Sequence, residues 1–191
     1  TLEQLAAAKS AAFDKTGTLT YGRPELVSVN PVNGFTADEL LGLAASAEQY
    51  SSHVLAASVL ASAEERGLPV HPADTAQEVA TNGVEAFIDG RTVRVGKRRF
   101  VEEVDPATQA ADLAPGQMVV YISVDGRFAG TLILSDTARE NAAATLERLR
   151  GLGIRETVML TGDGLATAES MGRAVGISDV RAELLPEDKV E

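Results

Sequence analysis

The sequence predicts an α/β fold in which an α+β domain is inserted into a parallel-sheet domain. Near both ends of the 191-residue chain, apolar strand segments precede loops and helical segments, a pattern typical of parallel sheets covered by helices. In the middle, two Asp-Gly pairs each separate two β-rich segments, which indicates antiparallel hairpins. We therefore expect one domain from residues 1–24 and 131–191, and a second from residues 25–130.

The N-terminal segment is expected to supply the first strand of the parallel sheet. Residues 2–9 have helical character, and the apolar run at 11–13 predicts a buried strand that ends at Asp14. Gly22-Arg23-Pro24 is a breaker and marks a candidate domain boundary. Residues 26–32 alternate weakly, as a strand does, and would begin the inserted domain.

Two helices are expected in the inserted segment. Thr36 and Glu39 form a capping box, which predicts a helix that runs to about Glu48. The serines at 51 and 52 are expected to cap the second helix, which Gly67 ends. The second helix is expected to carry an apolar stripe at helical spacing, which consists of Leu55, Val59, Leu60 and Ala63.

After the second helix, the spacing of apolar residues changes to the alternation that is typical of strands. Segments 84–88 and 92–95 flank Asp89-Gly90, and segments 118–124 and 128–134 flank Asp125-Gly126. Asp-Gly between two strand segments favours a two-residue hairpin turn. The middle of the chain therefore predicts an antiparallel sheet accompanied by two helices.

The C-terminal part returns to alternating strands and helices. A helix is expected from about residue 138 to 150, after Asp136, and a strand at 157–160 leads into Thr161-Gly162-Asp163. A further helix should end at Val175, because Gly176 is a typical residue beyond a helix C terminus.

Composition limits the classes of function. The formal net charge of −11 argues against a nucleic-acid-binding surface. The chain has no cysteine, so it forms neither disulfides nor thiolate metal sites. No apolar run reaches the ~20 residues of a membrane helix, and no signal peptide opens the chain. We expect an acidic, soluble, monomeric, intracellular protein.

The stretch from Phe13 to Thr20 has the residues of a phosphoryl-transfer site. In an open parallel sheet, ligands bind beyond the carboxyl ends of the strands, where Asp14 and Thr161 would both lie. A carboxylate at this position can act as a nucleophile and form an aspartyl phosphate. The residues expected to cradle the incoming anion are Lys15, Gly17, Thr18 and, from further along the chain, Lys189.

The segment Asp14–Thr20, DKTGTLT, resembles the phosphorylation motif of P-type ATPases within the haloacid dehalogenase superfamily. Thr161-Gly162-Asp163 is similar to that family's TGD motif, and residues 185–189, LPEDK, to its LPxDK segment. The resemblance covers essentially the whole chain. It implies a Rossmann-like parallel-sheet domain of the haloacid dehalogenase type, which carries the phosphorylation site, and an inserted domain that binds ATP or ADP.

The resemblance also implies roles for individual residues. Asp14 would be the phosphorylated nucleophile, and Thr161 and Lys189 would hold the phosphoryl oxygens. Asp14 and the carbonyl group of Thr16 would bind Mg²⁺. Asp136 and Asp163 would lie at the nucleotide crevice.

The short inserted segment resembles the compact nucleotide-binding domain of heavy-metal-transporting P-type ATPases. Those proteins open a helix with Ser-Glu-His-Pro, and residues 51–56 keep the histidine as His53 but replace the proline with Val54. Glu48 matches the family's adenine-side glutamate. The family's glycine loop, Gly-x-Gly-Val-x-Gly, is matched from Thr81 with only Gly83 retained, so a Cβ at 81 should narrow the adenine pocket. The segments around Thr161 and Lys189 resemble zinc, cadmium or cobalt pumps more than copper pumps.

The family's GDGxNDxP hinge motif and its membrane segments are absent from the chain. We therefore expect a fragment of a longer pump on the cytoplasmic face of a membrane, with the transmembrane and actuator domains of that pump as its partners. Such a fragment would bind nucleotide, would phosphorylate poorly by itself and would not bind the transported metal cation.

Two alternatives differ in class from a pump. Soluble phosphatases of the superfamily carry a second Asp two residues after the nucleophile, and Thr16 at that position weighs against this class. With Val54 and its altered loop, the inserted domain could instead act as a nucleotide-sensing binding module. The pair His71-Pro72 is interpreted as turn chemistry, and a basic cluster is interpreted as a solvated face rather than a phosphate site: Arg94, Lys97, Arg98 and Arg99.

Overall fold

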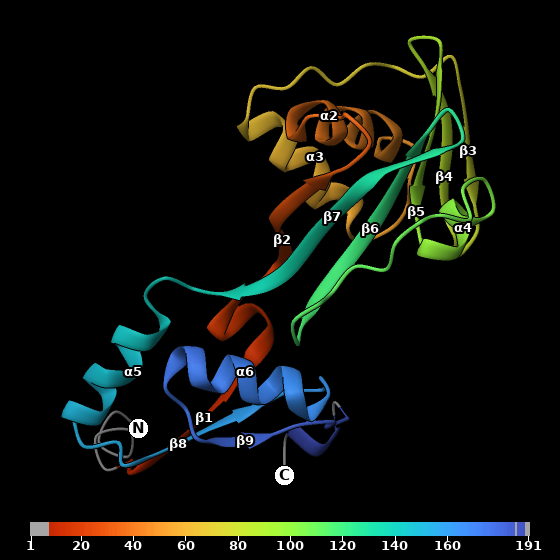
Figure 1. Cartoon of the computed structure of the whole chain (residues 1–191). Helices are drawn as coiled ribbons and strands as arrows, with labels where there is room; N and C mark the ends of the chain where they lie inside the picture. Colours follow the sequence, from red (N-terminus) through yellow and green to blue (C-terminus); the bar gives the residue numbers. More distant parts are fainter. Residues whose placement is uncertain (1–7, 186, 190–191) are drawn as a thin grey trace. The chain divides into compact units, whose positions relative to one another are not determined.

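The chain forms two compact units, which the computed structural model shows for residues 8–185 and 187–189, with Lys189 described by its backbone only. One unit comprises Thr1–Arg23 and Asp136–Glu191, and the other comprises Pro24–Ser135 (Figure 1). The expected boundary after residue 130 precedes the observed one, because strand β7 (Arg127–Ala138) still pairs with β6 (Gln117–Val124) at Ser135.

The discontinuous unit is built on a three-stranded sheet. Its strands β1 (Ser10–Asp14), β8 (Glu156–Leu160) and β9 (Asp179–Arg181) lie in the order β1-β8-β9, and both pairings are parallel. The two expected strands are confirmed, whereas β9 is too short to give a sequence pattern. The expected burial of residues 11–13 is wrong for Ala12, which is exposed, because Phe13 on the other face of β1 is the residue that packs into the core.

Two helices accompany this sheet, and α6 lies along it (Figure 1). Helix α6 (Leu165–Val175) ends at Gly176 as predicted, with the left-handed φ of 81°. Helix α5 (Ala142–Gly151) begins later than the expected residue 138, because β7 continues to that residue. The core between these elements contains Leu19, Ala142, Leu146, Met159, Ala168, Val175 and Ile177.

The segment around Asp14 differs in part from expectation. The helix expected at 2–9 falls mostly outside the described residues, and Ala8 and Lys9 are not helical. After β1 the chain makes a five-residue turn, η1 (Lys15–Leu19), in which Thr16 is extended and Gly17 has a φ of 77°. Strand β2 (Thr20–Pro31) then runs through the expected breaker at 22–24 without interruption, although the unit boundary lies there.

The second unit contains a six-stranded sheet in the order β2-β7-β6-β5-β4-β3. The neighbouring strands β4 (Gly83–Ile88) and β5 (Arg91–Gly96) form the first predicted hairpin, and β6 and β7 form the second. Both hairpins are confirmed, and each Asp-Gly pair has two positive φ values, as a type I′ turn requires. The edge strand β3 (Thr75–Val79) was not expected from the sequence.

Helices α2 (Ala37–Glu48) and α3 (Ala56–Glu65) cover one face of this sheet (Figure 1). The capping box of α2 is confirmed: Glu39 N–H donates to Thr36 Oγ1, and Thr36 N–H donates to a Glu39 carboxylate oxygen. The serines do not cap α3, which begins at Ala56; the backbone N–H and Oγ of Ser52 instead donate to Glu78 Oε1.

Both faces of the large sheet are packed. Alternate residues of β6, such as Val120 and Ile122, join the core beneath α2 and α3. Tyr121 between them points to the other face, where it packs with Phe128 and with Val101 of α4 (Arg98–Glu102). Within residues 8–185 and 187–189, no helix combines the length and the hydrophobicity needed to cross a bilayer.

Candidate functional site

Asp14 and Thr161 lie at the same edge of the parallel sheet. The register pairs Asp14, the last residue of β1, with Leu160, the last residue of β8, so Thr161 follows directly at that edge. Thr161 is 1% exposed, and its Oγ1 accepts a hydrogen bond of 3.1 Å from the backbone N–H of Asp163. The strand ends therefore bring a carboxylate and a hydroxyl-bearing loop together, as the sequence predicts.

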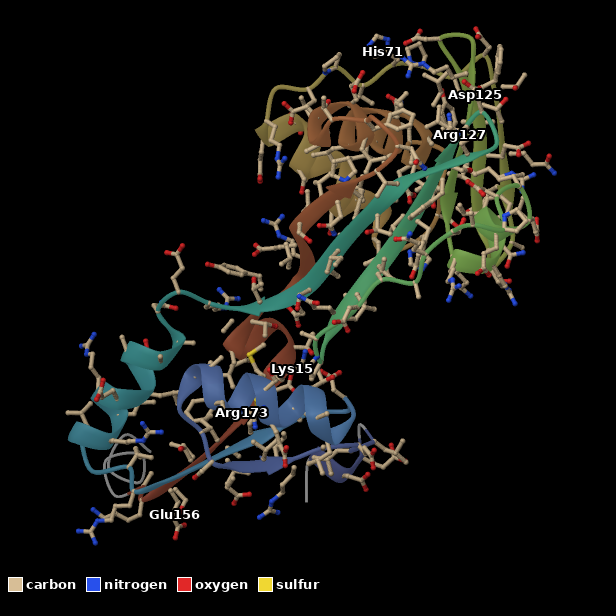
Figure 2. The ribbon with its side chains drawn as sticks, in the orientation of Figure 1. Lys15, His71, Asp125, Arg127, Glu156 and Arg173 are labelled. Atoms are coloured by element: carbon tan, nitrogen blue, oxygen red, sulfur yellow. The ribbon has the colours of Figure 1, made fainter. Side chains whose placement is uncertain are left out.

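Lys15, labelled in Figure 2, is buried and lies beside two carboxylates. It is 4% exposed, and its Nζ lies 3.0 Å from Asp136 Oδ2 and 2.9 Å from Asp163 Oδ2. Burial alone would lower the pKa of Lys15, but the hydrogen bonds and charges of Asp163 and Asp136 outweigh burial and raise it. The ammonium group therefore holds two carboxylates together, which differs from the expected place of Lys15 in an anion cradle.

The turn after Asp14 is exposed to solvent, and hydrogen bonds from Arg139 hold its backbone. Thr16, Gly17 and Thr18 are exposed. Arg139 donates from Nε to the carbonyl oxygen of Thr20 and from Nη2 to that of Gly17, both at 3.0 Å. No sequence pattern singled out Arg139, because its partners lie more than a hundred residues away in the chain.

Asp136 belongs to the cluster around Lys15. Its Oδ2 also accepts a hydrogen bond of 2.9 Å from Thr20 Oγ1, while its buried Oδ1 has no partner among the described residues. The residues expected at the nucleotide crevice, Asp136 and Asp163, thus both lie around Lys15, in the unit that carries Asp14.

The segment that precedes Lys189 packs on the loop after β8. Leu184 N–H donates to the Thr161 carbonyl oxygen at 3.1 Å, and Glu183 N–H donates to the Asp163 carbonyl oxygen at 2.9 Å. A Cβ at Gly162 would lie 3.2 Å from the Leu184 carbonyl oxygen, so glycine permits this approach. The backbone of Lys189 is in a 3-10 turn, and its side chain lies outside the described residues.

The second unit contains a cavity of about 650 Å³. The four residues of this unit that were expected to contact nucleotide, namely Glu48, His53, Thr81 and Gly83, all line it. Its walls are otherwise largely apolar and include Leu55, Val79, Val95, Met118, Val119 and Val120. A cavity of this size with a few polar groups is typical of small-molecule sites. Two further residues line the cavity: Glu78, which had no signal in the sequence pattern, and Lys97, which was expected on a solvated face.

Glu48 is the buried carboxyl group of this cavity. It is 4% exposed at the end of α2, and its Oε2 has no hydrogen-bond partner among the described residues. Burial, with a smaller contribution from the charge of Glu78, raises the pKa of Glu48 to about 7, against the opposing effect of a hydrogen bond from Ser51. The group therefore exists in both protonation states near neutral pH.

His53 is exposed just before α3. Its Nδ1 accepts a hydrogen bond of 3.3 Å from the backbone N–H of Leu55. A neutral imidazole that accepts at Nδ1 carries its proton on Nε2, so Nε2–H remains a donor.

The structure of the loop at 81–83 explains why Gly83, the one glycine that this chain keeps from the family's glycine loop, is needed. A Cβ at Gly83 would lie 2.1 Å from the Val95 carbonyl oxygen, and Gly96 on the neighbouring strand is equally restricted. Gly83 is therefore required for the pairing of β4 with β5. Thr81 has a φ of 65°, a left-handed conformation that glycine adopts with less strain.

The basic cluster at residues 94–99 and His71, both singled out in the sequence, contact other side chains. Arg94 pairs with Glu85 and Glu103, Arg98 pairs with Glu102, and Arg99 donates to Asn82, so of the cluster only Lys97 lines the cavity. His71, labelled in Figure 2, lies 2.9 Å from Asp89 Oδ2 beside a smaller cavity of about 300 Å³.

Comparison with known proteins identifies the family. Residues 8–191 match the family model of haloacid dehalogenase-like hydrolases. The chain is 40% identical over 189 residues to a cadmium, zinc and cobalt-transporting ATPase of Bacillus subtilis, covering 99% of this chain and 26% of that protein. It thus spans about a quarter of the length of this relative.

Two solved structures extend the comparison to the fold. A zinc-transporting PIB-type ATPase in an E2.Pi state has a TM-score of 0.83 and 33% identity, over 99% of this chain and 31% of that chain. The catalytic domain of a CPx-ATPase, described for its conformational changes upon nucleotide binding, has a TM-score of 0.64 and 26% identity, over 98% of this chain and 66% of that chain. The resemblance seen in the sequence is confirmed: the chain belongs to the haloacid dehalogenase-like hydrolases and matches the catalytic domain of heavy-metal P-type ATPases.

Proposed function

We propose that this chain binds ATP and carries the phosphorylated aspartate of a P-type ATPase that moves a heavy-metal cation across a membrane. The observation that carries the proposal is the cavity in the Pro24–Ser135 unit, where Glu48, His53, Thr81 and Gly83 converge although the chain separates them widely. The names of the similar proteins supply the transport function. The transported metal would bind elsewhere in the longer protein, because the membrane-embedded part selects it.

Asp14 is the proposed nucleophile. One oxygen of its carboxylate attacks the γ-phosphorus of ATP, a new O–P bond forms, the bond to the β-phosphate oxygen breaks, and ADP leaves. The Thr161 hydroxyl group at the same sheet edge can donate to a phosphoryl oxygen, and Lys189 is the proposed second partner.

Mg²⁺ is the proposed metal cofactor and would be held by the Asp14 carboxylate and the Thr16 carbonyl group. Mg²⁺ usually keeps several waters and uses one or two carboxylates together with substrate phosphates. This preference suits the donors present, since among the described residues no three His, Asp or Glu side chains gather into a metal site. When bound, Mg²⁺ would neutralise charge on the transferring phosphoryl group.

The residue two positions after the nucleophile supports a pump over a phosphatase. Thr16 is exposed at this position and has no carboxyl group that could serve as general acid or base. An aspartyl phosphate on Asp14 should therefore hydrolyse slowly until another part of the protein acts on it. The proposed partners are accordingly the actuator and transmembrane domains of the same pump, with this chain at the cytoplasmic face.

Calorimetric titration of the chain with ATP, ADP and AMP tests the nucleotide site. We expect the wild type to bind ATP and ADP, and His53→Ala to lose most of that affinity. His71→Ala is the matched control, since His71 borders the other cavity and should leave binding unchanged. Absence of binding at millimolar nucleotide, or equal loss in both histidine variants, would overturn the proposed site.

A further inference from the structure

Glu78 forms two hydrogen bonds to the His53 loop, residues 51–55, which precedes α3. The backbone N–H and the Oγ of Ser52 both donate to Glu78 Oε1, each at 2.8 Å, although Ser52 and Glu78 are 26 positions apart in the chain. These hydrogen bonds lower the pKa of Glu78, so the group is a carboxylate at neutral pH. Ser52 is therefore bound through both its backbone and its side chain to one charged oxygen.

The register of the sheet explains why the side chain of Glu78 reaches this loop. Glu78 of β3 pairs with Val84 on β4, and Val84 pairs with Val95 on β5. Residues that are directly opposite on neighbouring strands lie on the same face of a sheet, and Val84 and Val95 belong to the core beneath α2 and α3. Glu78 therefore extends from the helix-covered face, where it lines the 650 Å³ cavity together with Ser52 and His53.

The His53 loop belongs to no helix or strand, and residues 52–54 of it are exposed. A hydrogen bond of 3.0 Å from Ala56 N–H to the His53 carbonyl oxygen closes a turn that leads into α3. Val54 is the second residue of this turn, a position where proline would fix φ, and it is 68% exposed. Neither packing nor a proline ring therefore restricts the backbone at Val54, and the loop depends on its hydrogen bonds for a fixed conformation.

The position of His53 follows from that of the loop. Its backbone comes directly after Ser52, and its N–H donates to Ser51 Oγ at 3.2 Å. The Nδ1 atom of its imidazole accepts from the backbone N–H of Leu55 at 3.3 Å. Both of these contacts are with residues of the same loop, so they orient the imidazole relative to the loop but do not hold the loop against the sheet. The hydrogen bonds from Ser52 to Glu78 supply that second connection.

We propose that Glu78 is a positioning residue for nucleotide binding, which keeps the His53 loop in the conformation that presents His53 to the cavity. This inference rests on the proposed function, because it assumes that His53 contacts a nucleotide. It adds a residue that acts through another: the carboxylate of Glu78 holds the loop, and the loop places the imidazole. When only a fraction of the molecules has the loop in place, the apparent affinity for the ligand falls to the same fraction.

The first test measures the order of the loop without nucleotide, from the NMR relaxation order parameters of the His53 and Val54 amides. We expect values of about 0.85 in the wild type and below about 0.6 in Glu78→Ala. Glu78→Gln should resemble the wild type, because its amide oxygen still accepts from Ser52. Gln77→Ala is the matched control, since Gln77 is the exposed neighbour on β3 and is not among the residues that line the cavity.

The second test is calorimetric titration of the same variants with ADP. Glu78→Ala should bind ADP about tenfold more weakly, as expected if the loop is in place in about a tenth of the molecules. Glu78→Gln and Gln77→Ala should keep most of the wild-type affinity. Glu78→Ala combined with His53→Ala should bind no more weakly than His53→Ala alone, because the loop then has no imidazole to position.

Equal order parameters in the wild type and Glu78→Ala, or an unchanged affinity of Glu78→Ala for ADP, would overturn the inference. An equal loss of affinity with and without His53 would also overturn it, since Glu78 would then act on the nucleotide directly. In each of these cases the wild type still binds ADP, and the proposed function stands. If the wild type binds no ADP, the proposed function fails, and this inference fails with it.

Discussion

The Nζ atom of Lys15 lies 3.0 Å from Oδ2 of Asp136, although the two residues are 121 positions apart in the chain. The same ammonium group lies 2.9 Å from Asp163 Oδ2. Three segments thus meet at one buried cation: the turn that follows Asp14, the end of β7, and the loop after β8. The position of the proposed nucleophile is therefore linked to the two other loops at that sheet edge.

Replacing Lys15 should destabilise the discontinuous unit. Lys15→Met keeps the length of the side chain but leaves two carboxylates without their shared cation, and Asp136 is largely buried. Removing one partner of a buried pair typically costs about 3 kcal/mol. Urea unfolding should show this loss, whereas Lys9→Met at an exposed position should change little. Equal stabilities of the two variants would show that the cluster contributes nothing.

Thr81→Gly should stabilise the second unit and strengthen nucleotide binding. A left-handed φ costs a residue with a Cβ about 1 kcal/mol, and glycine removes that strain together with a side chain that lines the cavity. Thr92→Gly is the matched control, since Thr92 lies in β5 without a positive φ and glycine should weaken the strand. Urea unfolding should show a gain in stability for Thr81→Gly and a loss for Thr92→Gly. ADP titration of both variants should show stronger binding for Thr81→Gly alone.

Gly83→Ala should disrupt the β4–β5 pairing. The new Cβ would lie 2.1 Å from the Val95 carbonyl oxygen and 2.7 Å from Gly96 Cα, both backbone atoms that cannot move aside alone. We expect a loss of about 3 kcal/mol in the free energy of unfolding, at the upper end for overpacking.

Gly42→Ala is the control for Gly83→Ala, because it adds a Cβ where there is space for it. Gly42 lies inside α2, and its added Cβ would meet only the Pro69 carbonyl oxygen at 3.6 Å. Alanine there should stabilise the protein by about 0.5 kcal/mol, because it favours the helix. If thermal unfolding places both variants at the wild-type midpoint, the close approach at Gly83 does not restrict the sequence.

The stability of the second unit should fall as pH rises through the window set by Glu48. The pKa of this group is about 7 in the folded chain, compared with its ordinary value of 4.5. Between these values the folded state binds more protons than the unfolded state, so the free energy of unfolding decreases with rising pH. At about 1.4 kcal/mol per pH unit, the change from pH 5 to pH 8 is on the order of 2 to 3 kcal/mol.

Glu48→Gln should remove the part of the pH dependence of stability that the Glu48 carboxyl group causes. Denaturant unfolding of wild type and variant at about pH 5 and about pH 8 measures the difference, in which all other titrating groups cancel. The wild type should lose stability relative to the variant at the higher pH. Parallel pH dependences would mean that Glu48 ionises normally in the folded chain.

Local sequence patterns predicted the elements that local chemistry controls. The capping box at Thr36, the two Asp-Gly hairpins and the glycine stop at Gly176 all appear as expected, because backbone preferences and neighbouring hydrogen bonds decide them. The start of α3 was misplaced, since the expected capping serine Ser52 donates instead to Glu78 on β3, a partner that only tertiary contact provides.

The sequence by itself determined the family, the parallel and antiparallel parts of the fold, and the candidate residues, because motifs and periodicities are local properties. Only the tertiary structure decided what these residues contact. It placed Lys15 between two carboxylates, brought Glu48 and Gly83 to one cavity, and left Glu48 buried without a cation. The physical reason is that burial and charge pairing depend on segments far apart in the chain, which no local pattern specifies.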